Sequence, residues 1–174
     1  MASEVQVCNR ALQRLGETSI VSLTDDSKRA RACNLAYADL RDRELRAHPW
    51  NFAILRANLA ADATPPLHGP ANRFLLPADA LRLLPPDKFR NFNDLDWQIE
   101  GRYITTNDSD PLPVRYIARI TDPNTMDVLF RESLSCTIAF ELCEEITQSN
   151  SKKEGIRQDR RAIIAEARLL NSIE

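Results

Sequence analysis

The sequence predicts an α+β fold, mainly an α-helical bundle with a small antiparallel β-sheet region inserted between the N-terminal and C-terminal helices. In residues 1–48 and 121–174, apolar side chains recur three and four residues apart, which is typical of helices. In residues 97–103 and 114–120, apolar and polar side chains alternate, which is typical of strands. Because 174 residues suit one ordinary domain, we expect a single domain with a β-rich insertion over residues 49–120.

The composition is that of a soluble globular protein, with 43% hydrophobic and 28% charged residues. The net charge of -2 gives no global basic field for nucleic acid. No apolar run approaches the roughly 20 residues of a membrane span, and the N-terminus lacks a signal region, so we expect no membrane association. The four cysteines form no Cys-x-x-Cys pair, which favours reduced, buried thiols.

Two helices are predicted in the N-terminal region. Ser3 is a candidate N-cap of the first, and Gly16 stands where a left-handed C-cap belongs. The residues from Thr24 to Ser27 offer cap oxygens to a second helix that runs to about Ala47. Its predicted buried side contains Ala30, Cys33, Tyr37 and Leu40.

The other faces of this second helix alternate in charge. Asp39 and Arg43, and Asp42 and Arg46, are spaced at i,i+4. One interpretation is a solvated surface whose pairs each contribute a few tenths of a kcal/mol. The other is a contact with a neighbouring subunit, so these four residues are candidate ring or portal contacts.

The segment from Arg46 to Ala53 predicts a junction between helix and sheet. Pro49 ends the helix, and His48 is its predicted last residue. Trp50 and Phe52, two residues apart, would then share one face of an extended segment over residues 50–60. We interpret both as core anchors that fix the sheet against the helices.

The middle of the chain predicts one small antiparallel sheet with one face exposed to solvent. Its expected strands cover residues 73–76, 80–84, 97–103 and 114–120. A proline-rich loop is expected between Asp62 and Pro70, and a turn or hairpin loop at residues 107–111.

The C-terminal region predicts two further helices. Asp122 and Pro123 would start the first, whose nearly uncharged stretch from Ser133 to Cys143 indicates a buried central helix. A capping box from Ser151 to Glu154 would open the last helix. The last helix has an apolar stripe of Ile156, Ile163, Ala167 and Leu170, and a predicted basic outer surface of Arg157, Arg160, Arg161 and Arg168.

The sequence offers little for catalysis. His48 and His68 are the only imidazoles, and neither has a patterned nucleophile or metal ligand nearby. The four glycines fit no phosphate-binding loop. We therefore expect a protein that is not an enzyme, with no catalytic residues, no cofactor and no metal.

Three longer motifs follow one another in the chain. They are His48-Pro49-Trp50-Asn51-Phe52-Ala53, then Leu76-Pro77-Ala78-Asp79, then Tyr116-Ile117-Ala118-Arg119-Ile120-Thr121-Asp122-Pro123. Together with the run from Asp25 to Tyr37, they resemble the tail tubular protein A family, the head-to-tail adaptor (connector) proteins of short-tailed bacteriophages. The resemblance extends from the first helix to about Thr147.

This resemblance implies a structural virion protein that forms a homo-oligomeric ring, a dodecamer, between the portal protein and the tail nozzle. The ring would be a conduit for DNA packaging retention and ejection, with no sequence-specific DNA binding. It implies assembly in the host cytoplasm and a final place in the viral tail, at the head-tail junction, with tail fibres as a further candidate partner. The helices would make the ring and portal contacts, and the sheet would face the tail.

The alternative from another functional class is a small helical nucleic-acid-binding or regulatory module. The arginines of the last helix would then form its basic face. Under the adaptor hypothesis, reversing Arg160 and Arg161 to Glu is expected to leave the monomer folded and to impair portal docking.

Overall fold

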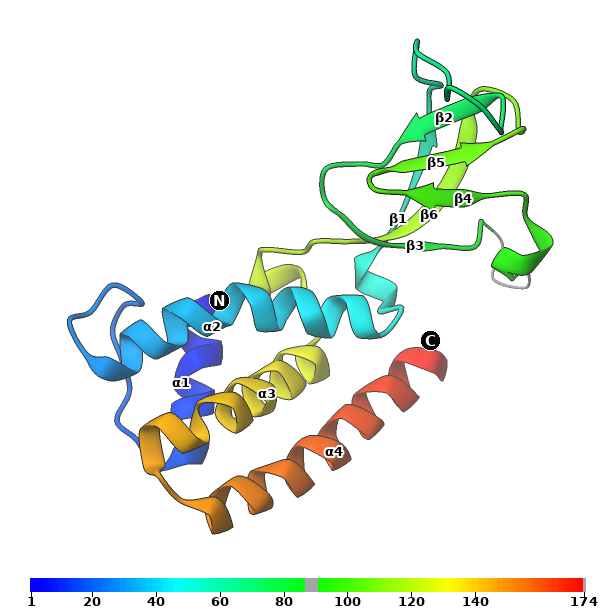
Figure 1. Ribbon diagram of the computed structural model, residues 1–174. Helices are drawn as coiled ribbons and strands as arrows, with labels where there is room; N and C mark the ends of the chain where they lie inside the picture. Colours follow the sequence, from blue (N-terminus) through cyan, green and yellow to red (C-terminus); the bar gives the residue numbers. More distant parts are fainter. Residues whose placement is uncertain (87–90, 174) are drawn as a thin grey trace. The chain divides into compact units, whose positions relative to one another are not determined.

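The computed structural model describes residues 1–86 and 91–173, and these residues form an α+β fold (Figure 1). They contain four α-helices and two antiparallel sheets of three strands each. The chain forms two compact units. The helical unit comprises Met1–Ala53 and Ile120–Glu174, and the β unit comprises Ile54–Arg119.

The helical unit is organised around α3 (Val128–Thr147), which contacts α1 (Glu4–Leu15), α2 (Lys28–Ala47) and α4 (Asn150–Ile173) (Figure 1). Every residue from Ser133 to Ala139 is buried, because a helix that is apolar on several sides can pack against neighbours all round. The prediction that this stretch is the central helix is confirmed.

The caps of the first two helices confirm the sequence-based predictions. Ser3 Oγ accepts a hydrogen bond from the Gln6 amide at 3.1 Å, and Gly16 ends α1 in the left-handed region with φ 75°. Ser27 Oγ accepts from the Ala30 amide at 3.1 Å and starts α2. The four residues predicted to form the buried side of α2, Ala30, Cys33, Tyr37 and Leu40, are all buried.

The starts of the two C-terminal helices differ from the predictions. Asp122 does cap a helical segment, but this is the short 3-10 turn η3 (Pro123–Thr125), and Asp127 then caps α3 through the Leu129 and Phe130 amides. The predicted capping box at Ser151 is also wrong. Gln148 ends α3 with φ 51°, so Ser149 is already placed to accept from the Lys152 amide and α4 begins at Asn150.

A short 3-10 turn lies between α2 and the first strand. His48 is the C-cap in an extended conformation, as the following proline requires. Residues 51–53 form the 3-10 turn η1 (Asn51–Ala53), and β1 (Ile54–Leu59) begins after it. The prediction that Trp50 and Phe52 share one face of a strand is therefore wrong.

The β unit contains two sheets where the sequence predicted one. In the first, β6 (Leu112–Ala118) lies between β1 and β3 (Ala80–Leu84). In the second, β5 (Tyr103–Thr106) lies between β2 (Asn72–Leu75) and β4 (Gln98–Glu100). We call them the β6 sheet and the β5 sheet. All neighbouring strands in both are antiparallel.

Two further elements of the β unit differ from the predictions. The predicted strand over residues 97–103 is a hairpin, because Gly101 adopts φ 61° and turns the chain between β4 and β5. The predicted hairpin loop at residues 107–111 joins β5 to β6, which belong to different sheets. Period-two alternation indicates strands but carries no information about which strands pair.

Candidate functional site

Trp50 is the aromatic anchor of the helical unit. Its ring is 1% exposed and packs edge-on against Phe130 of α3, with ring centroids 5.1 Å apart. Its indole Nε1 donates a hydrogen bond to the carbonyl oxygen of Glu44 at 3.0 Å. Phe52 contacts the same Phe130 ring at 5.1 Å. The junction segment is thereby held against both α2 and α3.

A buried carboxylate joins three helices of this unit. Glu44 of α2 is 3% exposed, and its Oε1 accepts from Arg160 Nη2 of α4 at 3.0 Å. Thr137 Oγ1 of α3 donates to the same Glu44 oxygen at 3.2 Å and accepts from Arg160 Nε at 2.9 Å. The prediction that Arg160 belongs to a basic outer surface is wrong, because its guanidinium points into this buried triad.

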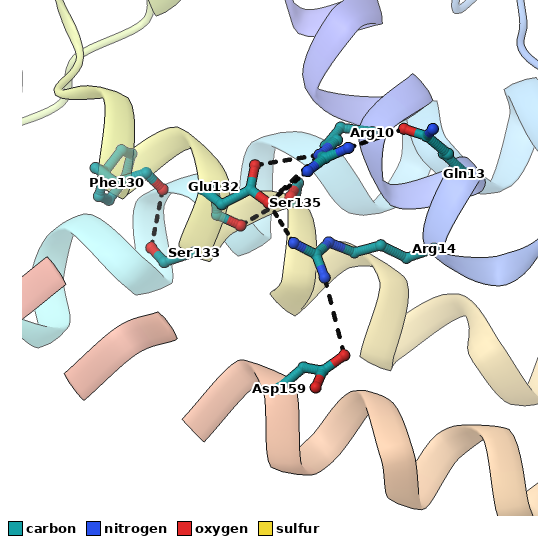
Figure 2. Close-up of polar contacts among 8 residues, drawn as sticks. All are labelled: Arg10, Gln13, Arg14, Phe130, Glu132, Ser133, Ser135 and Asp159. Carbon is teal, nitrogen blue, oxygen red and sulfur yellow. Dashed lines mark hydrogen bonds and ion pairs between the residues drawn. The ribbon is translucent and has the colours of Figure 1, made fainter. Parts of the chain in front are cut away.

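A second polar network links α1, α3 and α4 near the helix surface (Figure 2). The Glu132 carboxylate of α3 pairs with Arg10, whose Nη2 lies 3.2 Å from Glu132 Oε1, and with Arg14, both of α1. Arg14 also lies 4.0 Å from Asp159 of α4. Two arginines and two acids therefore link α1, α3 and α4 through ion pairs.

These contacts determine the ionisation of Glu132. Its partial burial raises the pKa of the carboxyl, but the hydrogen bonds from Arg10 and Arg14 outweigh that effect. The net result is a pKa below the ordinary value. Glu132 is consequently a carboxylate at neutral pH and acts as an ionic link between helices.

The candidate contact residues of α2 differ in their exposure to solvent. Asp39, Arg43 and Arg46 are exposed, whereas Asp42 is half-buried. Arg43 Nη1 lies 3.8 Å from Glu141 Oε2 of α3, and Asp42 Oδ1 lies 2.8 Å from Arg41 Nη2. This face of α2 therefore presents both signs of charge to solvent.

The candidate contact residues of α4 also differ in their exposure to solvent. Arg157 and Arg161 are exposed, and Arg157 lies 3.3 Å from Glu154 on the same helix. Arg168 is half-buried, and its Nε is buried without a hydrogen-bond partner among the described residues. Ile156 and Ala167 of the predicted apolar stripe are buried, while Leu170 is 43% exposed. The outer basic face thus consists of Arg157 and Arg161.

The buried charges of α2 were not predicted from the sequence. Arg41 and Glu44 are both buried, whereas the sequence pattern predicts charges only on the outer faces of α2. The sequence does contain a signal for Glu44. Leu40 follows Tyr37 by three residues and Glu44 follows Leu40 by four, so all three lie on the same buried face of the helix. A buried acid is destabilising without a cation beside it, and the half-buried Arg160 supplies that cation.

Chemically reactive groups are sparse in the part of the chain that the structure describes. Within residues 1–86 and 91–173, no group of three or more His, Cys, Asp or Glu could hold a metal ion. None of the described helices combines the length and apolar character needed to cross a bilayer. Cys8, Cys33, Cys136 and Cys143 are free and buried, as predicted, and burial raises the pKa of the Cys136 thiol.

The chain was also compared with known proteins. No family model matches it, and no curated protein matches it either.

Proposed function

We propose that this chain is a head-to-tail adaptor that forms a ring between a portal protein and a tail nozzle and gives a conduit for DNA. In this proposal the helices form a bundle, the strands form an insertion within one adaptor domain, and the protein is structural and has no enzymatic role. The proposal starts from the three motifs that follow one another along the chain between His48 and Pro123 and resemble this class of phage protein.

The observation that carries the proposal is the exposure of charges of both signs on the outer faces of α2 and α4. Asp39 and Arg43 are exposed on α2, and Arg157 and Arg161 on α4. A ring requires two different faces of each subunit to meet, since its contacts are heterologous. Mixed charge specifies such a contact through complementarity and adds little to the stability of the monomer.

The overall charge supports a conduit. With 23 basic and 25 acidic residues, the chain has a net charge of -2. A strongly basic channel would bind the passing phosphates and release counterions, which would slow the movement of DNA. A nearly neutral subunit avoids that cost.

Electron microscopy and native mass spectrometry of the cognate portal mixed with this protein test the proposal. We expect an additional ring on the portal, and a protein that stays off assembled portals would contradict the proposal. Arg161→Glu should weaken the addition because it reverses an exposed charge on α4. Arg161→Lys, which keeps the charge at the same exposed position, is the matched control.

A different result would favour the alternative function. Salt-sensitive DNA binding by the free protein, weakened by Arg157→Glu or Arg161→Glu, would identify the outer face of α4 as a nucleic-acid site. The salt slope of binding distinguishes this outcome from a portal contact, since duplex DNA releases counterions in proportion to the phosphates contacted.

A further inference from the structure

Two arginines face each other across neighbouring strands of the β6 sheet. Arg56 of β1 and Arg115 of β6 are paired in the antiparallel register. Directly opposite side chains lie on the same side of a sheet with their Cβ atoms about 4.5–5.5 Å apart, and like charges in this position are destabilising. The pair therefore costs stability unless an anion lies between the two guanidinium groups.

The surface around this pair is a groove of about 210 Å³. Pro86 and Pro113 contribute apolar lining, and Asn58 contributes an amide. Arg115 is half-buried, and its Nε is buried without a hydrogen-bond partner among the described residues. A buried donor without an acceptor is destabilising, so an acceptor from a binding partner would stabilise the Arg115 guanidinium.

The size and lining of the groove favour a carboxylate on a protein segment. A guanidinium fork matches the two oxygens of a carboxylate, and two such forks lie side by side in the groove. Nucleic acid would require a longer basic track for successive phosphates. The groove instead fits a single acidic side chain.

The same unit carries an acidic surface on its other sheet. Residues 91–110 contain five acids against one arginine, Asp94, Asp96, Glu100, Asp108 and Asp110 against Arg102. Asp94 and Asp108 are engaged within this segment, through the Asn91 amide and the Trp97 indole. Glu100 is exposed at the end of the edge strand β4 and has no ion pair among the described residues.

We propose that Arg56 and Arg115 bind Glu100 of a second copy of this chain, with its carboxylate between the two guanidinium groups. The groove belongs to the β6 sheet and Glu100 to the β5 sheet, so the contact joins two different surfaces and repeats from copy to copy. The inference rests on the proposed ring and assigns one of its subunit contacts to the β unit.

Disulfide trapping between two full-length variants tests this contact without altering the ion pair. Asn58→Cys places a thiol at the groove, and Gln98→Cys places one on β4, and both positions are exposed. The four native cysteines are buried, so the introduced thiols react preferentially. The variants are mixed, one with a tag that changes its mass, and oxidised with copper phenanthroline.

The expected result is a heterodimer in excess of the statistical mixture, and a loss of this excess in high salt. Adding Arg56→Glu to the groove variant should abolish the excess. The urea midpoint of each variant verifies folding. A statistical mixture, or no effect of Arg56→Glu, would overturn the inference.

The two proposals fail in different ways. A statistical mixture from a protein that still adds a ring to the portal would reject the Arg56–Glu100 contact and leave the adaptor function standing. A specific heterodimer from a protein that never binds portals would retain the contact and reject the adaptor function.

Discussion

Arg160 of α4 and Glu44 of α2 form an ion pair whose Nη2–Oε1 distance is 3.0 Å, with the carboxylate almost completely removed from solvent. Thr137 of α3 hydrogen-bonds to both partners. A carboxylate in the interior is tolerated because a cation and a hydroxyl compensate for its lost hydration. The pair therefore specifies where α4 docks on the other helices.

Replacing Arg160 with Glu should destabilise the protein strongly. The substitution would leave Glu44 buried beside a second negative charge, and breaking a buried pair costs about 3–5 kcal/mol. Urea unfolding followed by circular dichroism measures the loss. Arg161→Glu is the neighbouring control, and it should change stability by about 0.5 kcal/mol or less because Arg161 is exposed.

This result would also separate folding from docking. The expectation that reversing Arg160 and Arg161 together leaves the monomer folded does not fit the ion pair between Arg160 and the buried Glu44. Arg161 alone is the position for testing portal contacts. Equal stability of the two single variants would contradict the buried triad.

Glu132 should make stability depend on pH. Its carboxyl has a lowered pKa in the folded protein, so its stabilising effect is present above the unfolded-state pKa and is lost as pH falls through the folded-state value. Glu132→Gln removes this contribution. Urea unfolding at about pH 7 and about pH 3 should show a smaller difference for Glu132→Gln than for the parent protein. An unchanged difference would mean that Arg10 and Arg14 do not stabilise the charged form.

Two glycines should respond oppositely to alanine. Gly16 has φ 75°, where an alanine Cβ is strained, so Gly16→Ala should cost about 1–2 kcal/mol. Gly155 lies within α4 with nothing within 4 Å of an added Cβ. Gly155→Ala should therefore stabilise the protein by about 0.5–1 kcal/mol. Thermal unfolding of both variants checks the signs, and destabilisation by Gly155→Ala would contradict the helical placement.

The two tryptophans should also differ. Trp50→Phe removes the hydrogen bond to the Glu44 carbonyl and leaves a void beside Phe130, at a cost of about 2 kcal/mol. Trp97 is half-buried and donates to Asp108, so Trp97→Phe should cost less. Denaturant unfolding compares the two variants, and equal costs would argue against Trp50 as an anchor.

Local signals explain what was predictable. Ser3, Gly16 and Ser27 fix helix ends through contacts within four residues, so the bounds of α1 and α2 follow from the sequence. The nearly uncharged stretch of α3 from Ser133 to Cys143 likewise predicts its central position. The strand β3 was predicted with its observed bounds, Ala80–Leu84. Each of these features depends on neighbours along the chain.

The sequence by itself thus determined the α+β class, the first two helices and the buried helix α3. Tertiary structure alone decided that Arg160 faces Glu44 across 116 residues of chain, and that β5 and β6 belong to separate sheets. It also decided the register that sets Arg56 opposite Arg115. The physical reason is that helix ends and periodicity depend on adjacent residues, whereas the partner of a charge or a strand is selected by packing between distant segments.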